Sequence, residues 1–99
     1  MAKVYVVQRT EHNFVPATDF GDIEFVALVN YPKFENPVKH VEFMKSKLAD
    51  FGPADYLLIV GDPLNIGVAM AILSKKGPFA ALKWDNMSNK YVPVTIRGV

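Results

Sequence analysis

The chain has 99 residues, which is enough for one folded domain with a single hydrophobic core. Its formal net charge is +1, so no strong electrostatic field favours nucleic acid or an anionic membrane as a partner. It contains no cysteine, which excludes disulfides and thiolate metal sites, and its two histidines lack the neighbours that zinc requires, so we expect no metal and no cofactor.

Two strands are predicted in the first third of the chain. Residues 3–9 form the first, and a polar loop over residues 10–21 follows it. Residues 22–30 form the second. Both faces of this segment are apolar, which predicts a central or nearly central place in a sheet.

A helix is predicted over residues 37–51, because Asn36-Pro37 is a typical helix start and Gly52-Pro53 a typical stop. The apolar stripe that would face the sheet consists of Pro37, Val41, Met44, Leu48 and Phe51. Phe43 falls on the opposite, polar face and is predicted to be an exposed aromatic residue.

The clearest pattern in the chain is a buried strand over residues 56–60 that leads through a tight turn into a helix from residue 63. Asp62 can cap the helix and Pro63 suits its first position. Lys75 and Lys76 suit the last turn, and Gly77 is a typical residue beyond a helix end. This is half of a parallel β-α-β unit.

A β-hairpin is predicted at residues 78–97, with a turn over residues 86–89. Pro93 places the last strand at a sheet edge. Trp84 and Tyr91 are expected to be cross-strand neighbours that stabilise the hairpin. Basic residues accompany these aromatics, but Asp85 and the low net charge make nucleic-acid binding an unfavoured interpretation.

These elements predict a single α/β domain over residues 1–99, with the order β-β-α-β-α-β-β. The sheet is expected to be mixed and mostly parallel, with about five strands, two helices and a C-terminal hairpin. The position and direction of the first strand stay open.

A ligand site is one functional hypothesis, because open α/β sheets bind ligands at the carboxyl ends of their strands. Its polar groups would be His12, Lys33, Asp62 and Asn65, serving a small ligand or a nucleotide. The helix cap explains Asp62 more simply, and the chain has no glycine-rich phosphate motif.

His12 could form an acid–base pair with Asp62 or Glu11 if the first strand is parallel to the third. A solvated loop histidine is the simpler interpretation of His12. His40 lies on the flank of the first predicted helix, and the argument for a functional role is weaker there than for His12. No nucleophile, metal or phosphate constellation indicates an enzyme.

The second helix supports a different hypothesis, because apolar residues occupy all of its sides and such a helix should be covered all round. The first helix or the loop over residues 10–21 could cover it. Otherwise it is an interface for a second copy or another protein, and the interface candidates are Phe43, Ile66, Met70 and Leu73. We favour such a non-enzymatic interaction protein.

Several motifs resemble a class of short, uncharacterised proteins of tailed bacteriophages. They are His12-Asn13-Phe14 with Phe20-Gly21, the run from Asp55 to Pro63, Leu82-Lys83-Trp84-Asp85, and Tyr91-Val92-Pro93-Val94. The resemblance implies a small protein of the host cytoplasm that binds a host or phage protein. It implies no reaction and no catalytic residue.

Overall fold

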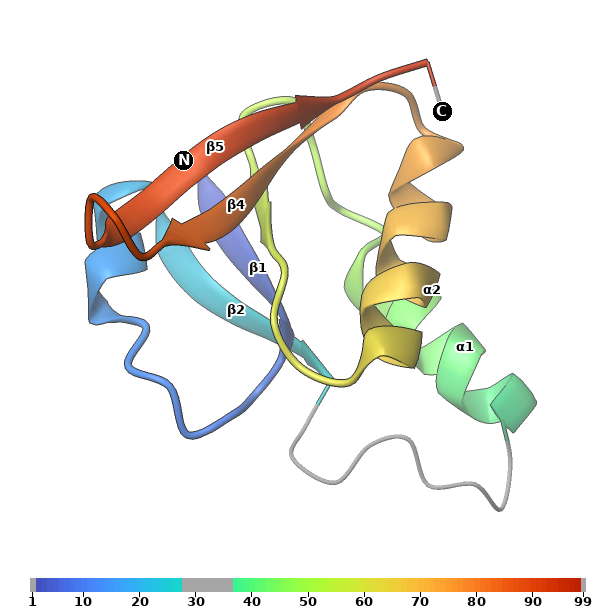
Figure 1. Cartoon of the computed structure of the whole chain (residues 1–99). Helices are drawn as coiled ribbons and strands as arrows, with labels where there is room; N and C mark the ends of the chain where they lie inside the picture. Colours follow the sequence, from blue (N-terminus) through green and yellow to red (C-terminus); the bar gives the residue numbers. More distant parts are fainter. Residues whose placement is uncertain (1, 28–36, 99) are drawn as a thin grey trace.

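Five strands form one sheet in the order β2-β1-β3-β4-β5 (Figure 1). The computed structural model describes residues 2–27 and 37–98. The elements in chain order are β1 (Lys3–Gln8), the 3₁₀ helix η1 (Val15–Asp19), β2 (Asp22–Ala27), α1 (Pro37–Lys47), β3 (Tyr56–Leu58), α2 (Pro63–Ser74), β4 (Phe79–Asp85) and β5 (Lys90–Ile96). This confirms the predicted α/β class and the predicted order of strands and α-helices; η1 lies in the segment predicted to be a loop.

The first strand, whose place was open, lies inside the sheet. β1 pairs in parallel with β2 on one side and with β3 on the other. β3 pairs in parallel with β4, and β5 closes the hairpin in the antiparallel direction. The carboxyl ends of β1 to β4 therefore meet at one end of the sheet.

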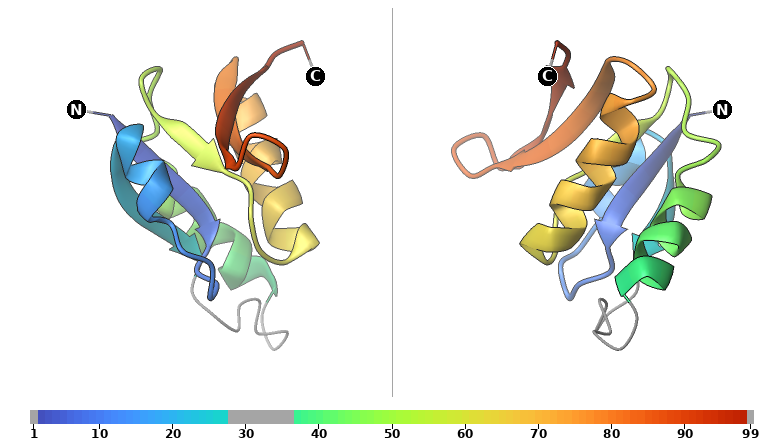
Figure 2. Two further views of the ribbon diagram at one scale, coloured as in Figure 1. Left: turned by 60° about the vertical axis from the view of Figure 1, so that its left-hand side comes forward. Right: turned by 90° about the vertical axis from the view of Figure 1, so that its right-hand side faces the viewer.

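The sheet is covered on both faces (Figure 2), with α1 and α2 on one face and η1 on the other. In β1, Tyr5 and Val7 pack in the cluster with the α-helices, while Val4 and Val6 pack in the cluster with η1. From β1 to β2 the chain moves towards one edge of the sheet, whereas from β2 to β3 and from β3 to β4 it moves towards the other edge. Because parallel crossovers have one hand, connections that move towards opposite edges lie on opposite faces of the sheet.

The predicted central place of the second strand is wrong, because β2 is an edge strand. Its two apolar faces are nevertheless both covered. Phe14 contacts Phe25 from the η1 side at 5.8 Å between ring centroids, and Val26 belongs to the same buried cluster as Met44 of α1. Apolarity on both sides of a strand thus reports the layers above and below it. The rest of the predicted strand, residues 28–30, lies outside the described residues.

α1 ends at Lys47, one turn earlier than the predicted end at Phe51. The ammonium group of Lys76 donates hydrogen bonds to the carbonyl oxygens of Leu48 (3.0 Å) and Ala49 (2.7 Å) in the turn after the helix. A lysine satisfies such carbonyls and suits the negative end of the helix dipole. Lys76 therefore connects the end of α2 to the end of α1.

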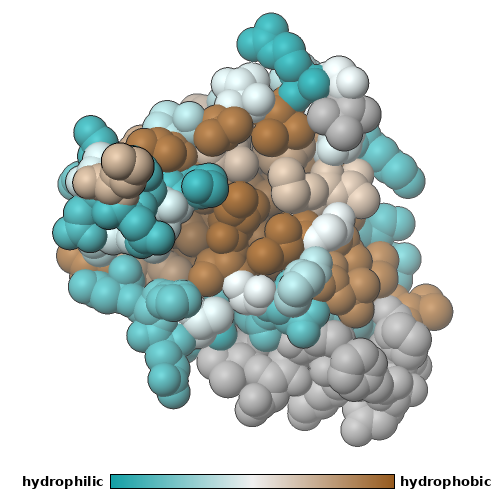
Figure 3. Space-filling view, viewed as in Figure 1, coloured by the Kyte–Doolittle hydropathy of each residue, from teal (hydrophilic) through white to brown (hydrophobic). Residues whose placement is uncertain are grey.

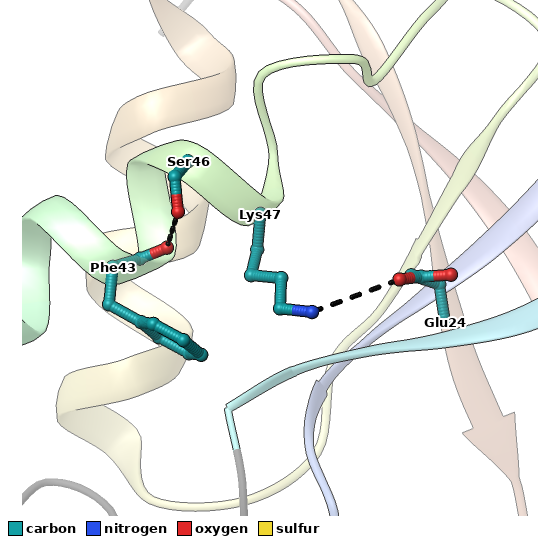
Figure 4. Close-up of polar contacts among 4 residues, drawn as sticks. All are labelled: Glu24, Phe43, Ser46 and Lys47. Atoms are coloured by element: carbon teal, nitrogen blue, oxygen red, sulfur yellow. Dashed lines mark hydrogen bonds and ion pairs between the residues drawn. The ribbon is translucent and has the colours of Figure 1, made fainter.

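The outer side of α1 is tied to the edge of the sheet. Figure 4 shows Lys47 reaching from α1 towards Glu24 of β2, with 4.0 Å between Nζ and Oε1. The hydroxyl of Ser46 donates to the carbonyl oxygen of Phe43 at 2.7 Å. Phe43 is half-buried, not exposed as predicted, and its ring lies 5.9 Å from the Lys47 ammonium.

Candidate functional site

A pocket of about 450 Å³ opens at the carboxyl ends of β3 and β4, on the face that carries η1. Hydrophobic residues gather beside the β4–β5 hairpin in the middle of the face that Figure 3 shows. The residues that line the pocket are His12, Asn13, Pro16, Leu58, Ile59, Val60, Trp84, Asn86 and Tyr91. Three separate stretches of the chain therefore build it: the loop after β1 with the start of η1, the end of β3, and the hairpin.

Trp84 and Tyr91 form the aromatic wall of the pocket. They are direct cross-strand partners, and their rings meet edge to face at 4.9 Å between centroids. Tyr91 is only 8% exposed, and this burial raises the pKa of its phenol above the usual value of 10.0. The predicted pairing of the two residues is confirmed, and it also provides a flat, apolar surface.

His12 and Asn13 are polar lining residues from the loop after β1, which is held by local hydrogen bonds. The Thr10 hydroxyl accepts from the His12 N–H at 3.3 Å, and Asn13 Oδ1 accepts from the Val15 N–H at 3.0 Å. The second bond ends on the first residue of η1, and the ring of Phe14, the residue just before η1, packs in the buried cluster on this face. The amide nitrogen of Asn13 stays available as a donor.

Asn86 lies at the rim, in a hairpin turn that Asp85 organises. The Asp85 carboxylate accepts from the hydroxyl of Ser88 and from the N–H groups of Ser88 (3.2 Å) and Met87 (3.4 Å). These bonds, above all that of the Ser88 hydroxyl, lower the pKa of Asp85. The carboxylate serves the turn, and none of the described lining residues is a lysine, an arginine or a carboxylic acid.

A family model described as Phage Pam3 gp32-like protein matches residues 2–98. The chain belongs to this family. The match confirms the resemblance to phage proteins that the sequence motifs indicated. The searches of curated proteins and of solved structures found no match.

A buried polar network lies at the same end of the sheet in this phage-family protein. Asn65 of α2 is fully buried, and its Nδ2 donates to Gln8 Oε1 at 3.0 Å. The Asp62 N–H donates to the same oxygen at 2.7 Å, and His40 Nε2 lies 2.5 Å from Asn65 Oδ1. The network connects β1, α1 and the start of α2.

One backbone group sets the orientation of this network. The Asp62 N–H can only donate, so the Gln8 atom that faces it must be the oxygen. Asn65 must then present its amide nitrogen to Gln8 and its oxygen to His40. It follows that His40 Nε2 carries a hydrogen and donates it to Asn65.

The structure separates the four predicted ligand groups. His12 lines the pocket, whereas Asp62 caps α2 by accepting the Leu64 N–H at 2.8 Å and is not among the lining residues. Asn65 is buried in the network just described and is closed to a ligand from solvent. Lys33 lies outside the described residues. The acid–base pair of His12 and Asp62 therefore has no common pocket.

The predicted interface residues also differ in exposure. Leu73 is 1% exposed and belongs to the core, so it cannot contact a partner. Ile66 and Met70 are half-buried and pack against that core. The side of α2 that faces solvent is instead the side of Leu64, Gly67 and Ala71.

Sequence reasoning missed the buried roles of Gln8 and His40, although His40 carried a usable signal. It precedes Met44 by four residues and Leu48 by eight, so it lies on the inward side of α1. The pocket had no comparable signal, because nothing local to the hairpin indicates that the loop after β1 packs beside it.

No three histidine or acidic side chains within residues 2–27 and 37–98 come together as metal ligands do. Over the same ranges, none of the helices has both the length and the apolar character needed to cross a bilayer.

Proposed function

We propose that this phage-family protein is a non-enzymatic interaction protein that pairs with a second copy of itself through α2. The contact surface would be the α2 outer face, which we define as Leu64, Gly67 and Ala71 with Val68 and Met70 at its sides. The observation that carries the proposal is the lack of any charged side chain between Pro63 and Ser74 on a helix with a solvent-exposed side.

An exposed helix side in a globular protein normally carries polar or charged residues. On α2, Leu64 is 51% exposed, and Gly67 and Ala71 are exposed as well. The loop over residues 10–21 was one predicted cover for this helix, but it packs on the opposite face of the sheet. α1 lies beside α2 and leaves its outer face uncovered.

A second copy suits this face better than an unrelated helix because the two ends of α2 are complementary. Asp62 precedes the helix and Lys75 follows it, and both are exposed. In an antiparallel pair related by a two-fold axis, the acidic start of each helix approaches the basic end of the other, and the helix dipoles oppose. Gly67 would lie near the axis, where the lack of a side chain permits close approach.

The test is the solution mass from light scattering over a concentration series, for the natural protein and for Gly67→Glu. A Cβ atom at Gly67 meets nothing within 4 Å, so the substitution does not disturb the fold, and glutamate favours a helix more than glycine does. We expect a dimer for the natural protein and a monomer for Gly67→Glu, with the far-UV circular dichroism unchanged.

The matched control is Val38→Glu, which adds the same charge on α1 at a residue that is 71% exposed. It should leave the dimer intact. A natural protein that stays monomeric at all concentrations would contradict pairing with a second copy, and capture of a phage or host protein by α2 would then be the alternative. A dimer that persists in Gly67→Glu would place the contact elsewhere.

Binding of a small ligand at the strand carboxyl ends is a second candidate function, and the pocket favours it. Ligand sites in proteins are typically hollows of roughly 300–1,000 Å³ with mostly apolar walls and a few polar groups. The pocket beside Trp84 meets this description, with His12, Asn13 and Asn86 as its polar groups.

A further inference from the structure

We propose that the pocket between His12 and the β4–β5 hairpin binds an uncharged heteroaromatic ring, of the class of a free nucleobase or nucleoside. The inference rests on the second candidate function and goes beyond it by naming the chemistry of the ligand. Shape, wall composition and charge each support it.

The aromatic wall favours a flat ring. Trp84 and Tyr91 line one side of the pocket, and the imidazole of His12 lines another. Because the Trp84 and Tyr91 rings meet at an interplanar angle of 73°, they form a corner and do not stack on each other. A ring that enters this corner can stack on one of them and meet the edge of the other.

The polar groups favour a ring with hydrogen-bonding atoms at its edge. Asn13 keeps its amide nitrogen as a donor after its oxygen has accepted the Val15 N–H. Asn86 and His12 each offer a donor and an acceptor. Carboxamide groups match the neighbouring donors and acceptors of a base edge, as they do where proteins read bases.

The described lining of the pocket lacks the basic side chains that would bind a phosphate group on the ligand. None of the described lining residues is basic, and the carboxylate of Asp85, which adjoins the lining residues Trp84 and Asn86 in the chain, is held by the turn. The start of α2 offers no alternative anion site, because the Asp62 carboxylate occupies it. The proposal therefore commits to a base or nucleoside, and a 5′-phosphate should add no affinity.

Trp84 provides the assay, because it is the sole tryptophan of the chain and lines the pocket. Its fluorescence is followed while adenosine, guanosine, cytidine and uridine are added, up to millimolar concentration. Adenosine monophosphate and cyclohexanol serve as the charged and the non-aromatic comparison. We expect a saturable change with at least one nucleoside, no gain with the monophosphate, and no response to cyclohexanol.

Three variants test the residues, each checked for folding by circular dichroism. Tyr91→Leu removes an aromatic ring, His12→Leu removes the imidazole, and Asn86→Ala removes an exposed amide without touching the core. Each should weaken nucleoside binding by roughly tenfold or more, equivalent to the loss of one good contact. Met87→Ala, in the same turn at a residue that is 97% exposed, should bind as the natural protein does.

The outcomes separate the two levels of the proposal. If cyclohexanol binds and the nucleosides do not, the pocket is a ligand site but the heteroaromatic class is wrong. If none of the probes changes the Trp84 emission, both the class and the second candidate function are overturned. If a nucleoside binds equally well to Tyr91→Leu, His12→Leu and Asn86→Ala, it binds outside this pocket and the inference fails.

Discussion

Asn65 is the residue on which the packing of both helices at the carboxyl end of the sheet depends. It is fully buried, and it contacts Gln8 of β1 through its amide nitrogen and His40 of α1 through its oxygen. A buried carboxamide is tolerated only when its polar atoms have hydrogen-bond partners, and here both the nitrogen and the oxygen of Asn65 have one. A residue that seemed suited to a ligand instead organises the interior.

Asn65→Leu keeps the approximate size of the side chain and removes both hydrogen bonds. We expect it to lower the free energy of unfolding by about 1–3 kcal/mol, because buried partners lose their bonds. Urea denaturation followed by circular dichroism measures the change. A variant as stable as the natural protein would show that the network contributes no net stability.

At the hairpin turn, the Ser88 hydroxyl is the main reason that the pKa of Asp85 is lowered. A carboxyl with a lowered folded-state pKa adds stability above its unfolded-state pKa, and this contribution is lost as the pH falls through the folded-state value. Ser88→Ala should therefore move the Asp85 pKa upwards towards the usual value of 3.8. The stabilisation that the carboxylate still gives to the turn would then be lost at a higher pH during acidification. The carboxyl carbon shift in an NMR pH titration reports it, and an unchanged midpoint would assign the lowering to the backbone bonds.

Among the elements, α2 was predictable because its signals are local. The Asp62 cap, Pro63 and the residues after Ser74 fix its two ends within a few residues of sequence. The strands were predictable as segments for the same reason. The place of β2 was not, because its apolar faces are explained by Phe14 and Met44, which are distant in sequence.

The connection from β3 into α2 gives a matched pair of glycine substitutions. Gly61 has φ of +113°, and a Cβ atom there would lie 2.5 Å from Gln8 Cβ, so Gly61→Ala should destabilise the fold by about 1–3 kcal/mol. Gly67 lies inside the helix, where a Cβ atom meets open space within the chain, so Gly67→Ala should stabilise the folded monomer by about 0.5–1 kcal/mol when it is measured at a concentration too low for pairing. Thermal unfolding of both proteins measures the difference. Equal effects at the two sites would contradict the described geometry of the connection.

At the scale of the whole molecule, the order of the strands could not be derived from the sequence. β1 lies between β2 and β3, and this arrangement depends on pairing across tens of residues. The pocket has the same origin: Trp84 and Tyr91 were recognised as a pair, but the packing of the His12 loop beside them is a long-range event. The elements could thus be predicted from local residues; of the pocket, the sequence indicated His12 and the carboxyl end of the sheet, but not the wall that the hairpin provides.

The strand order predicts a gradient of hydrogen exchange across the sheet. The amides of β1, β3 and β4, each paired on both sides, should exchange most slowly, and those facing outwards on the edge strands β2 and β5 most rapidly. Amide exchange followed by NMR measures this. Protection of the outward amides of β5 equal to that of β1 would mean that this edge is covered in solution.

The pocket joins an early part of the chain, at His12, to a late part, at Tyr91. During synthesis the ribosome releases the loop after β1 long before the hairpin that completes the opposite wall. A translation product that stops before Tyr91 would still contain β1 to β4, and so four of the five strands, but its cavity would lack Tyr91 and with it half of the aromatic wall. Any binding that depends on the pocket would therefore begin only after the hairpin has left the ribosome.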